Sequence, residues 1–152
     1  KWLTEIEVID YTFSGHYQTD VYFYEWPRDG RIVREPVTLQ RVRALIVEPS
    51  AGEELDRGEV PIRGMAWSGA APIARVEESV GGDAWQEARL VGERKRHSWQ
   101  PWELIARIEQ PGMTIVRARA TDLAGRTQPE RADWNRLGYG SNAISEVPVQ
   151  VR

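Results

Sequence analysis

The 152-residue chain contains no cysteine and only two histidines, His16 and His97. Without cysteine it has no disulfides, thiolate zinc sites or thiol nucleophile, and with two isolated histidines we predict no metal site. No apolar run approaches the ~20 residues of a membrane-spanning helix, so we expect no membrane span. The 20 Lys and Arg residues against 23 Asp and Glu residues give a net charge of −3, which argues against a nucleic-acid-binding protein.

Motifs that mark catalysis are also missing. The chain has no Gly-x-Ser-x-Gly string and no glycine-rich phosphate loop. Neighbouring carboxylates such as Glu77 and Glu78 would point to opposite faces of a strand and could not cooperate. The chain begins at Lys1 and runs straight into Trp2 and Leu3, so we expect it to be a piece of a longer protein.

What the chain does contain is alternating, β-branched sequence between turn residues. Seven strands with a turn signal about every ten residues are typical of an immunoglobulin-like two-sheet β-sandwich, with a barrel as the alternative. Pro148 lacks an N–H donor, so we expect the last strand to lie at an edge or to have this amide position pointing outward. The strands are predicted over residues 43–47, 60–67, 73–80, 85–91, 102–109, 114–121 and 147–151.

The first 41 residues differ from the rest. Residues 3–9 alternate and predict an N-terminal strand, and an aromatic-rich, extended arm follows, polar over residues 27–36. This segment is too short to build a core of its own. The fold class is therefore all-β, a sandwich preceded by a strand and an extended arm.

The seven tryptophans allow two interpretations. They could form a stacking platform, which would make the chain a free-standing module that binds carbohydrate or peptide. They could instead anchor the core and a protein interface, since tryptophan supplies a large buried area. We favour the second and predict that Trp67 and Trp102 lie inside the sandwich with their indole N–H groups hydrogen-bonded.

Several short strings recur in the order and spacing of a known family. With these strings, residues 40–152 closely resemble the C-terminal dimerisation domain of sulfite-oxidase-type molybdenum enzymes, and residues 1–22 resemble the end of that family's molybdopterin-binding domain. The strings are GMAWSG at 64–69, IARVEES at 73–79, WQEA at 85–88, WEL at 102–104, RARATDLAG at 117–125 and WNRLGY at 134–139.

The resemblance implies that the chain contains parts of two domains of a larger enzyme. Residues 1–41 would be the end of the molybdopterin-binding domain and the linker, and residues 42–152 an immunoglobulin-like dimerisation domain. The fragment itself would be non-catalytic and hold no cofactor, while the parent enzyme would carry molybdenum on molybdopterin, bound through a cysteine of another domain. Its partners would be a second copy of itself and the parent's molybdopterin domain.

The parent's substrate stays open. The resemblance implies oxidation of sulfite or a related sulfur compound, and a carrier-bound sulfur compound, nitrate or an oxidised amino acid are alternatives. A bacterial family member would be periplasmic.

The resemblance assigns roles to two residues. Lys1 matches a lysine that approaches the anionic end of molybdopterin, a suitable point-charge partner. Arg136 lies one place before the position of an arginine that lines the anionic substrate pocket in animal relatives, where this chain has Leu137. We also expect a register change around residues 77–83, because an inward Glu78 would be costly without a partner.

Overall fold

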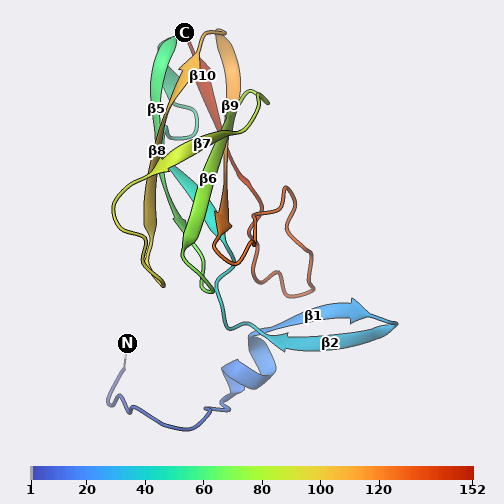
Figure 1. Cartoon of the computed structure of the whole chain (residues 1–152). Coiled ribbons are helices and arrows are strands. Elements are labelled where there is room, and N and C mark those ends of the chain that lie inside the picture. Colours follow the sequence, from blue (N-terminus) through green and yellow to red (C-terminus); the bar gives the residue numbers. More distant parts are fainter. Residues whose placement is uncertain (1) are drawn as a thin grey trace. The chain divides into compact units, whose positions relative to one another are not determined.

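The structure, a computed structural model, describes residues 2–152, and Lys1 lies outside the described residues. Apart from one π-helical turn, η1 (Tyr17–Val21), the regular elements of the described chain are β-strands (Figure 1). These strands are β1 (Phe23–Arg28), β2 (Arg31–Pro36), β3 (Arg43–Glu48), β4 (Glu54–Leu55), β5 (Gly58–Trp67), β6 (Ile73–Val80), β7 (Gln86–Leu90), β8 (Gln100–Ile108), β9 (Gly112–Asp122) and β10 (Ser145–Val151).

The chain divides into two compact units. The larger unit, the sandwich, comprises Leu39–Asp133 and Gly140–Arg152. The smaller one, here called the N-terminal unit, comprises the chain up to Thr38 together with Trp134–Tyr139. The segment between β9 and β10 therefore leaves the sandwich, contributes six residues to the other unit and returns.

The sandwich has two sheets joined by one strand. Its strand order is β3-β5-β8-β7-β6-β9-β10-β4, antiparallel except for the short β4, which pairs parallel with β10. Strand β7 pairs with β6 through Ala88 and Val76, and with β8 through Leu90 and Trp102. Figure 1 shows β7 lying between β8 and β6. This arrangement confirms the immunoglobulin-like two-sheet sandwich.

The core follows from the period-two pattern of the strands. Along β5, Val60 and Ile62 are buried while Pro61 and Arg63 between them are exposed. All seven predicted strands are present, and the two-residue β4 is added to them. Pro148 lies on β10 opposite Ile115, and its carbonyl accepts a hydrogen bond from the N–H of Gly52 at 2.8 Å. Strand β10 lies between β9 and β4, so the expectation of an edge strand is wrong. Because the N–H and C=O groups of one residue in an antiparallel strand point to the same side, the amide position of Pro148 points away from β9, as the other alternative predicts.

Trp102 is the largest side chain in this core, with 1% of its surface exposed. Its ring lies against Gly64 on β5, where a Cβ atom would come within 2.3 Å of the ring. Glycine at this position thus makes room for the indole. The prediction of burial is confirmed for Trp102, but that of a hydrogen-bonded indole is wrong, because Nε1 has no partner among residues 2–152. Trp67 is only half-buried and stacks on Trp99, so its placement inside the core is wrong as well.

Gln128 ties the two sheets together. It is 3% exposed, and its Oε1 accepts hydrogen bonds from the N–H groups of Ala44 on β3 at 2.6 Å and Ala120 on β9 at 3.1 Å. Its Nε2 donates to the carbonyl of Ala143 at 3.1 Å. One loop side chain therefore satisfies backbone groups of both layers that would otherwise be buried without partners.

Glu78 faces the interior of the sandwich. It is fully buried on β6, opposite Ala118 of β9, and neither carboxylate oxygen has a hydrogen-bond partner among the described residues. Pairing with β9 is regular from Val76 to Val80, and the irregularity lies earlier, between Ile73 and Arg75. The predicted register change around residues 77–83 is therefore wrong. Glu78 points inward without a hydrogen-bond partner, which is the arrangement that was expected to be costly in free energy.

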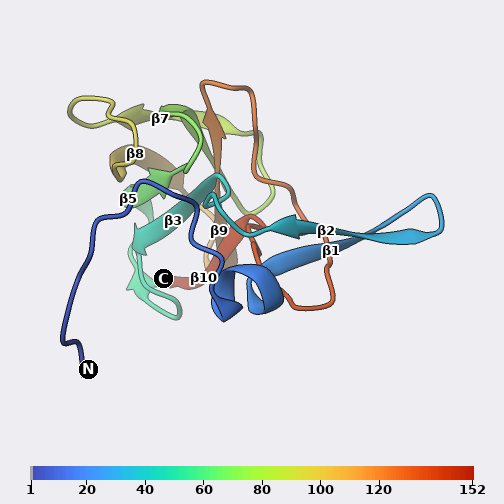
Figure 2. The same ribbon diagram turned by 90° about the horizontal axis from the view of Figure 1, so that it is seen from below.

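In the N-terminal unit the strand expected over residues 3–9 is not formed. Its alternating side chains are exposed, with Ile6 at 79% and Val8 at 97%, so no face is buried to hold an extended segment in a sheet. The unit contains instead the antiparallel hairpin of β1 and β2 (Figure 2). Its turn residues Asp29 and Gly30 both have positive φ, as a two-residue hairpin turn requires.

Membrane-spanning helices were expected to be absent. Within residues 2–152, none of the helical structure has the length and apolar character needed to cross a bilayer.

Candidate functional site

The segment that carries Arg136 is a small loop closed on itself. Asn135, 2% exposed, donates from Nδ2 to the carbonyl of Tyr139 at 2.7 Å and accepts the N–H of Tyr139 on Oδ1 at 3.3 Å. Gly138 donates its N–H to the carbonyl of Asn135 at 3.0 Å and has a φ of 72°, which favours glycine. The buried asparagine thus fixes the loop, while the Trp134 and Arg136 side chains point outward.

Arg136 is paired with the hairpin of the same unit. The hairpin register places Glu25 of β1 opposite Arg34 of β2, and Nη2 of Arg34 lies 3.3 Å from Oε1 of Glu25. Nε of Arg136 donates to Oε2 of the same carboxylate. The Glu25 side chain is only 10% exposed, whereas Arg34 and Arg136 remain largely exposed. One shielded carboxylate therefore holds two accessible guanidinium groups.

The electrostatics of this cluster favour an anion. The hydrogen bond from Arg136, aided by the charges of Arg136 and Arg34, lowers the pKa of Glu25 against the opposing effect of desolvation. Two guanidinium groups against one carboxylate leave one net positive charge. Beside it is a cavity of about 660 Å³ lined by Trp134, Pro27 and Ile32 in addition to the three charged residues. Such a site can bind and orient an anion but offers no group that transfers protons near neutral pH.

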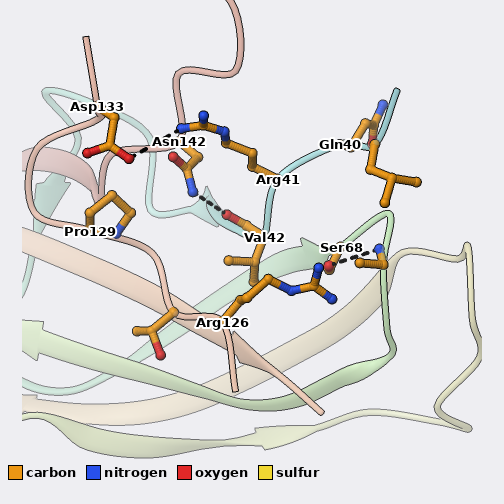
Figure 3. Close-up of a pocket in the computed structure, with 11 residues that line it drawn as sticks. Gln40, Arg41, Val42, Ser68, Arg126, Pro129, Asp133 and Asn142 are labelled. Carbon is orange, nitrogen blue, oxygen red and sulfur yellow. Dashed lines mark hydrogen bonds and ion pairs between the residues drawn. The ribbon is translucent and has the colours of Figure 1, made fainter. Parts of the chain in front are cut away.

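A second cavity, of about 300 Å³, belongs to the sandwich (Figure 3). Arg41 and Asp133 line it with their charged groups 3.8 Å apart. Asn142 donates from Nδ2 to the carbonyl of Val42 at 3.1 Å, while its buried Oδ1 has no partner among the described residues. Figure 3 shows these side chains around the mouth of the cavity, with Arg126 on its opposite wall.

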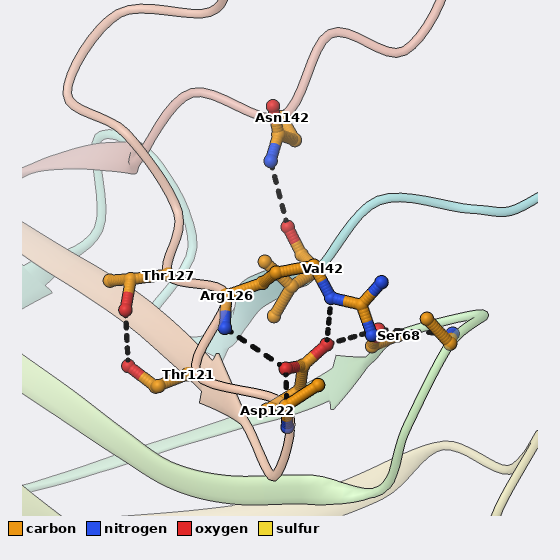
Figure 4. Close-up of polar contacts among 9 residues, drawn as sticks. Val42, Ser68, Thr121, Asp122, Arg126, Thr127 and Asn142 are labelled. Carbon is orange, nitrogen blue, oxygen red and sulfur yellow. Dashed lines mark hydrogen bonds and ion pairs between the residues drawn. The ribbon is translucent and has the colours of Figure 1, made fainter.

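The wall of this cavity is a hydrogen-bonded cluster centred on Asp122 (Figure 4). Oδ2 of Asp122 accepts from Ser68 Oγ at 2.8 Å and from Arg126 Nε at 3.0 Å, and Oδ1 accepts the N–H groups of Ala124 and Arg126. Burial raises the pKa of Asp122, but the hydrogen bonds from Ser68 and the backbone and the charge of Arg126 outweigh it and lower the pKa. Since these charges are matched within the chain, the cluster acts as a structural support for the end of the sandwich.

The residues predicted from the sequence are thus placed as follows. Arg136 lies in the charged cluster of the N-terminal unit, and Lys1 lies outside the described residues. Glu25 and Arg34 were not predicted, although the Asp29–Gly30 turn is a sequence signal that sets them opposite each other. Among residues 2–152, no group of three or more His, Asp or Glu side chains could hold a metal ion.

The tryptophans do not form a common platform within the sandwich. Trp67 stacks on Trp99, with ring centroids 5.7 Å apart. Trp102 is buried, and Trp85 is covered by the guanidinium group of Arg119 at 4.2 Å. This distribution does not favour the carbohydrate- or peptide-binding alternative.

Comparison with known proteins extends over almost the whole chain. Residues 34–152 match the family described as the Mo-co oxidoreductase dimerisation domain. Mitochondrial sulfite oxidase of Mus musculus is 34% identical over 166 residues, covering 99% of this chain and 30% of the relative. Nitrate reductase [NADH] 1 of Phaseolus vulgaris is 27% identical over 176 residues, covering 99% of this chain and 20% of the relative.

A solved structure gives the same result. The sulfane dehydrogenase SoxCD from Paracoccus pantotrophus superposes with a TM-score of 0.75 at 26% identity, covering 90% of this chain and 36% of that one. The chain therefore spans about a third or less of the length of the proteins it matches.

Proposed function

The chain belongs to the family of Mo-co oxidoreductase dimerisation domains, and from this membership we propose that it joins two copies of a sulfite-oxidase-type molybdenum enzyme. The match over residues 34–152 carries the proposal, because it covers the whole sandwich. We further propose that residues 1–41 are the end of the molybdopterin-binding domain and its linker, and residues 42–152 the dimerisation domain. The parent's other partner is then its own molybdopterin domain.

The test of this proposal is the mass of the chain in solution. We expect light scattering at tens of micromolar to give twice the 17.4 kDa of the monomer. Two identical sandwiches can associate about a two-fold axis through the same surface on each. A mass of one chain over the whole accessible concentration range would contradict self-association of this domain.

The parent's cofactor would be molybdenum on molybdopterin, which supplies the two-electron redox chemistry when it is bound. The residues of this chain do not fit the metal, because the chain has no cysteine to provide a thiolate ligand. Lys1 is proposed only as a contact to the anionic end of the cofactor. We assign no chemical step to this chain. In a bacterial host the parent would be periplasmic.

We propose that Arg136 contacts the anionic substrate of the parent enzyme, sulfite or a related sulfur compound. The geometry that supports this is the pairing of an exposed Arg136 with a single carboxylate that it shares with Arg34. A guanidinium group binds an oxyanion through two parallel hydrogen bonds. Glu25 would then hold the arginine in position while leaving part of its hydrogen-bonding capacity for the substrate.

For Arg136→Gln in the full-length parent, we expect KM for the substrate to rise about tenfold, because one charge-assisted hydrogen bond is lost. The turnover number kcat should change less, since the residue takes no part in proton transfer. Arg31→Gln, at the exposed tip of the same hairpin, is the matched control and should leave KM unchanged. Equal KM values for the two variants would exclude Arg136 from the substrate site.

A further inference from the structure

The loop that joins β7 to β8 carries a run of three exposed cations, Arg94, Lys95 and Arg96 (Figure 1). Nζ of Lys95 lies 3.2 Å from Oε2 of Glu93. Within residues 2–152, the guanidinium groups of Arg94 and Arg96 have neither an ion-pair nor a hydrogen-bond partner. The loop, here called the basic loop and comprising residues 91–99, therefore presents two guanidinium groups with their full hydrogen-bonding capacity.

Hydrogen bonds hold the base of the basic loop in place. Gln100, 3% exposed, donates from Nε2 to the carbonyl of Val91 at 2.7 Å, and the N–H of Val91 donates to the carbonyl of Pro101 at 2.9 Å. Within the loop, His97 has a φ of 56°, a left-handed conformation that histidine adopts more often than most side chains. Because its base is fixed, the loop loses less conformational entropy when it binds a partner.

The basic loop ends in an aromatic stack. Trp99, 66% exposed, stacks on Trp67 of β5, and the register of β3 and β5 places Arg43 opposite Trp67. Nη1 of Arg43 donates to the carbonyl of Ser141 at 3.4 Å, and no carboxylate of the described chain forms an ion pair with this arginine. The stack therefore has Arg43 on its β3 side and the basic loop on its β8 side.

These residues form a surface with an excess of positive charge. We call it the basic-aromatic patch: Arg43, Trp67, Arg94, Lys95, Arg96 and Trp99. Its four cations face one carboxylate, that of Glu93, while the net charge of the whole chain is −3. The rest of the chain therefore has an excess of negative charge.

The charges next to the patch do not cancel this excess. Two ion pairs on the neighbouring strands are neutral: Arg63 with Glu48, and Arg89 with Glu103. Glu87 on β7 has no ion pair among residues 2–152, but it lies beyond Arg89 as seen from the basic loop, where it pairs with Glu77 of β6.

We propose that the basic-aromatic patch binds an acidic segment of a different protein, in which carboxylates flank an apolar side chain. The carboxylates pair with Arg94, Arg96 and Arg43, since a guanidinium group binds a carboxylate through two parallel hydrogen bonds. The apolar side chain packs on the exposed indole of Trp99. Tryptophan and arginine are the residues most enriched among those that dominate binding energy at protein interfaces. This inference does not depend on the proposed self-association.

The distribution of charge favours a short acidic segment over an extended polyanion. A nucleic acid or an anionic bilayer continues beyond the patch and meets the negative excess of the rest of the chain, which repels it. A short segment needs only the patch. The acidic chain as a whole thus selects against long polyanions, while the patch attracts a compact one.

The experiment measures fluorescence anisotropy of a fluorescein-labelled, glutamate-rich peptide with one central leucine, titrated with the 152-residue chain. We expect binding that weakens as the ionic strength rises, and no binding of the analogue with glutamine in place of glutamate. Arg94→Ser combined with Arg96→Ser should weaken binding about tenfold, because two ion pairs are lost. Trp99→Ala should weaken it about fivefold, but should not affect the peptide with glycine in place of leucine.

Arg57→Ser is the matched control. Arg57 is exposed and has no ion pair among the described residues, and it precedes Gly58, at the end of the β5–β8 ladder away from Gln100. This variant should bind the peptide as the wild type does. Melting temperatures equal to that of the wild type establish that all the variants are folded.

Three results would overturn the proposal. The first is no binding of the peptide to the wild-type chain, or equal binding of the glutamine analogue. The second is an affinity that falls as much in Arg57→Ser as in the double variant, because the charge of the chain rather than the patch would then be responsible. The third is tighter binding of a labelled single-stranded oligonucleotide or of phosphatidylserine vesicles, which would assign the patch to an extended polyanion.

Discussion

Replacing Trp102 by alanine should destabilise the sandwich by about 3–5 kcal/mol, the usual cost of truncating a buried aromatic side chain to alanine. The indole is 1% exposed and lies on Gly64, which has no side chain to fill the space that the ring would vacate. This loss is comparable with the whole stability of many domains of this size. Urea denaturation of the variant and the wild type measures it directly.

Two further variants make this test specific. Trp67→Ala removes a half-buried indole and should cost about 1 kcal/mol. Trp102→Phe keeps most of the apolar contact and removes the unpaired Nε1–H group, so it should cost less than Trp102→Ala. If Trp102→Ala were no less stable than Trp67→Ala, the central place of Trp102 in the core would be wrong.

The second large effect concerns Glu78 and the pH. Burial, together with the nearby negative charge of Asp83, raises the pKa of Glu78 from 4.5 to about 7. A carboxyl group with a raised pKa in the folded state is tolerated best when protonated. Folding stability should therefore be highest below pH 4.5, fall as the pH rises from 4.5 to about 7, and stay constant above that as far as this group is concerned.

Glu78→Met should abolish this decline, because a flexible apolar side chain fills the same space without a charge. The free energy of unfolding of the variant minus that of the wild type should therefore increase by about 3 kcal/mol as the pH rises from 4.5 to 8. This is the value that the shift in the pKa of Glu78 implies. Denaturant melts at several pH values measure the gain.

Glu77→Gln is a matched control for this experiment. Glu77 is the neighbour of Glu78 on the outer face, where the hydrogen bond from Arg119 lowers its pKa. Its removal should therefore reduce stability at neutral pH instead of raising it. A stability difference between wild type and Glu78→Met that does not change with pH would show that folding does not shift the pKa of Glu78.

The sequence predicted the sandwich well because each of its strands buries one face. Alternation was a reliable guide from Arg43 onward, where the inward residues meet a second layer. The same pattern over residues 3–9 was misleading, since no second layer covers that segment. The hairpin of β1 and β2 was missed because its second strand is exposed throughout and has no hydrophobic face to signal it.

Side-chain partners were harder to predict than strands. Arg136 could be singled out by resemblance, but its partner Glu25 lies 111 residues away in the sequence and only the fold brings the two together. Gln128 and Asp122 lie in or next to a turn, where the sequence gives no sign of the backbone groups that they will satisfy. Glu78 contradicts the expected pattern, and physical reasoning alone predicts that it should have turned outward or found a partner.

The path of the chain between Asp133 and Gly140 has a practical consequence for building chimaeras. The residues up to Thr38 and the six residues Trp134–Tyr139 form one unit although they are far apart in sequence. A hybrid made with a single crossover near residue 39 would combine Glu25 from one relative with Arg136 from another. To keep Glu25 and Arg136 from the same relative, one donor has to supply both segments of this unit. The hybrid then needs three junctions rather than one.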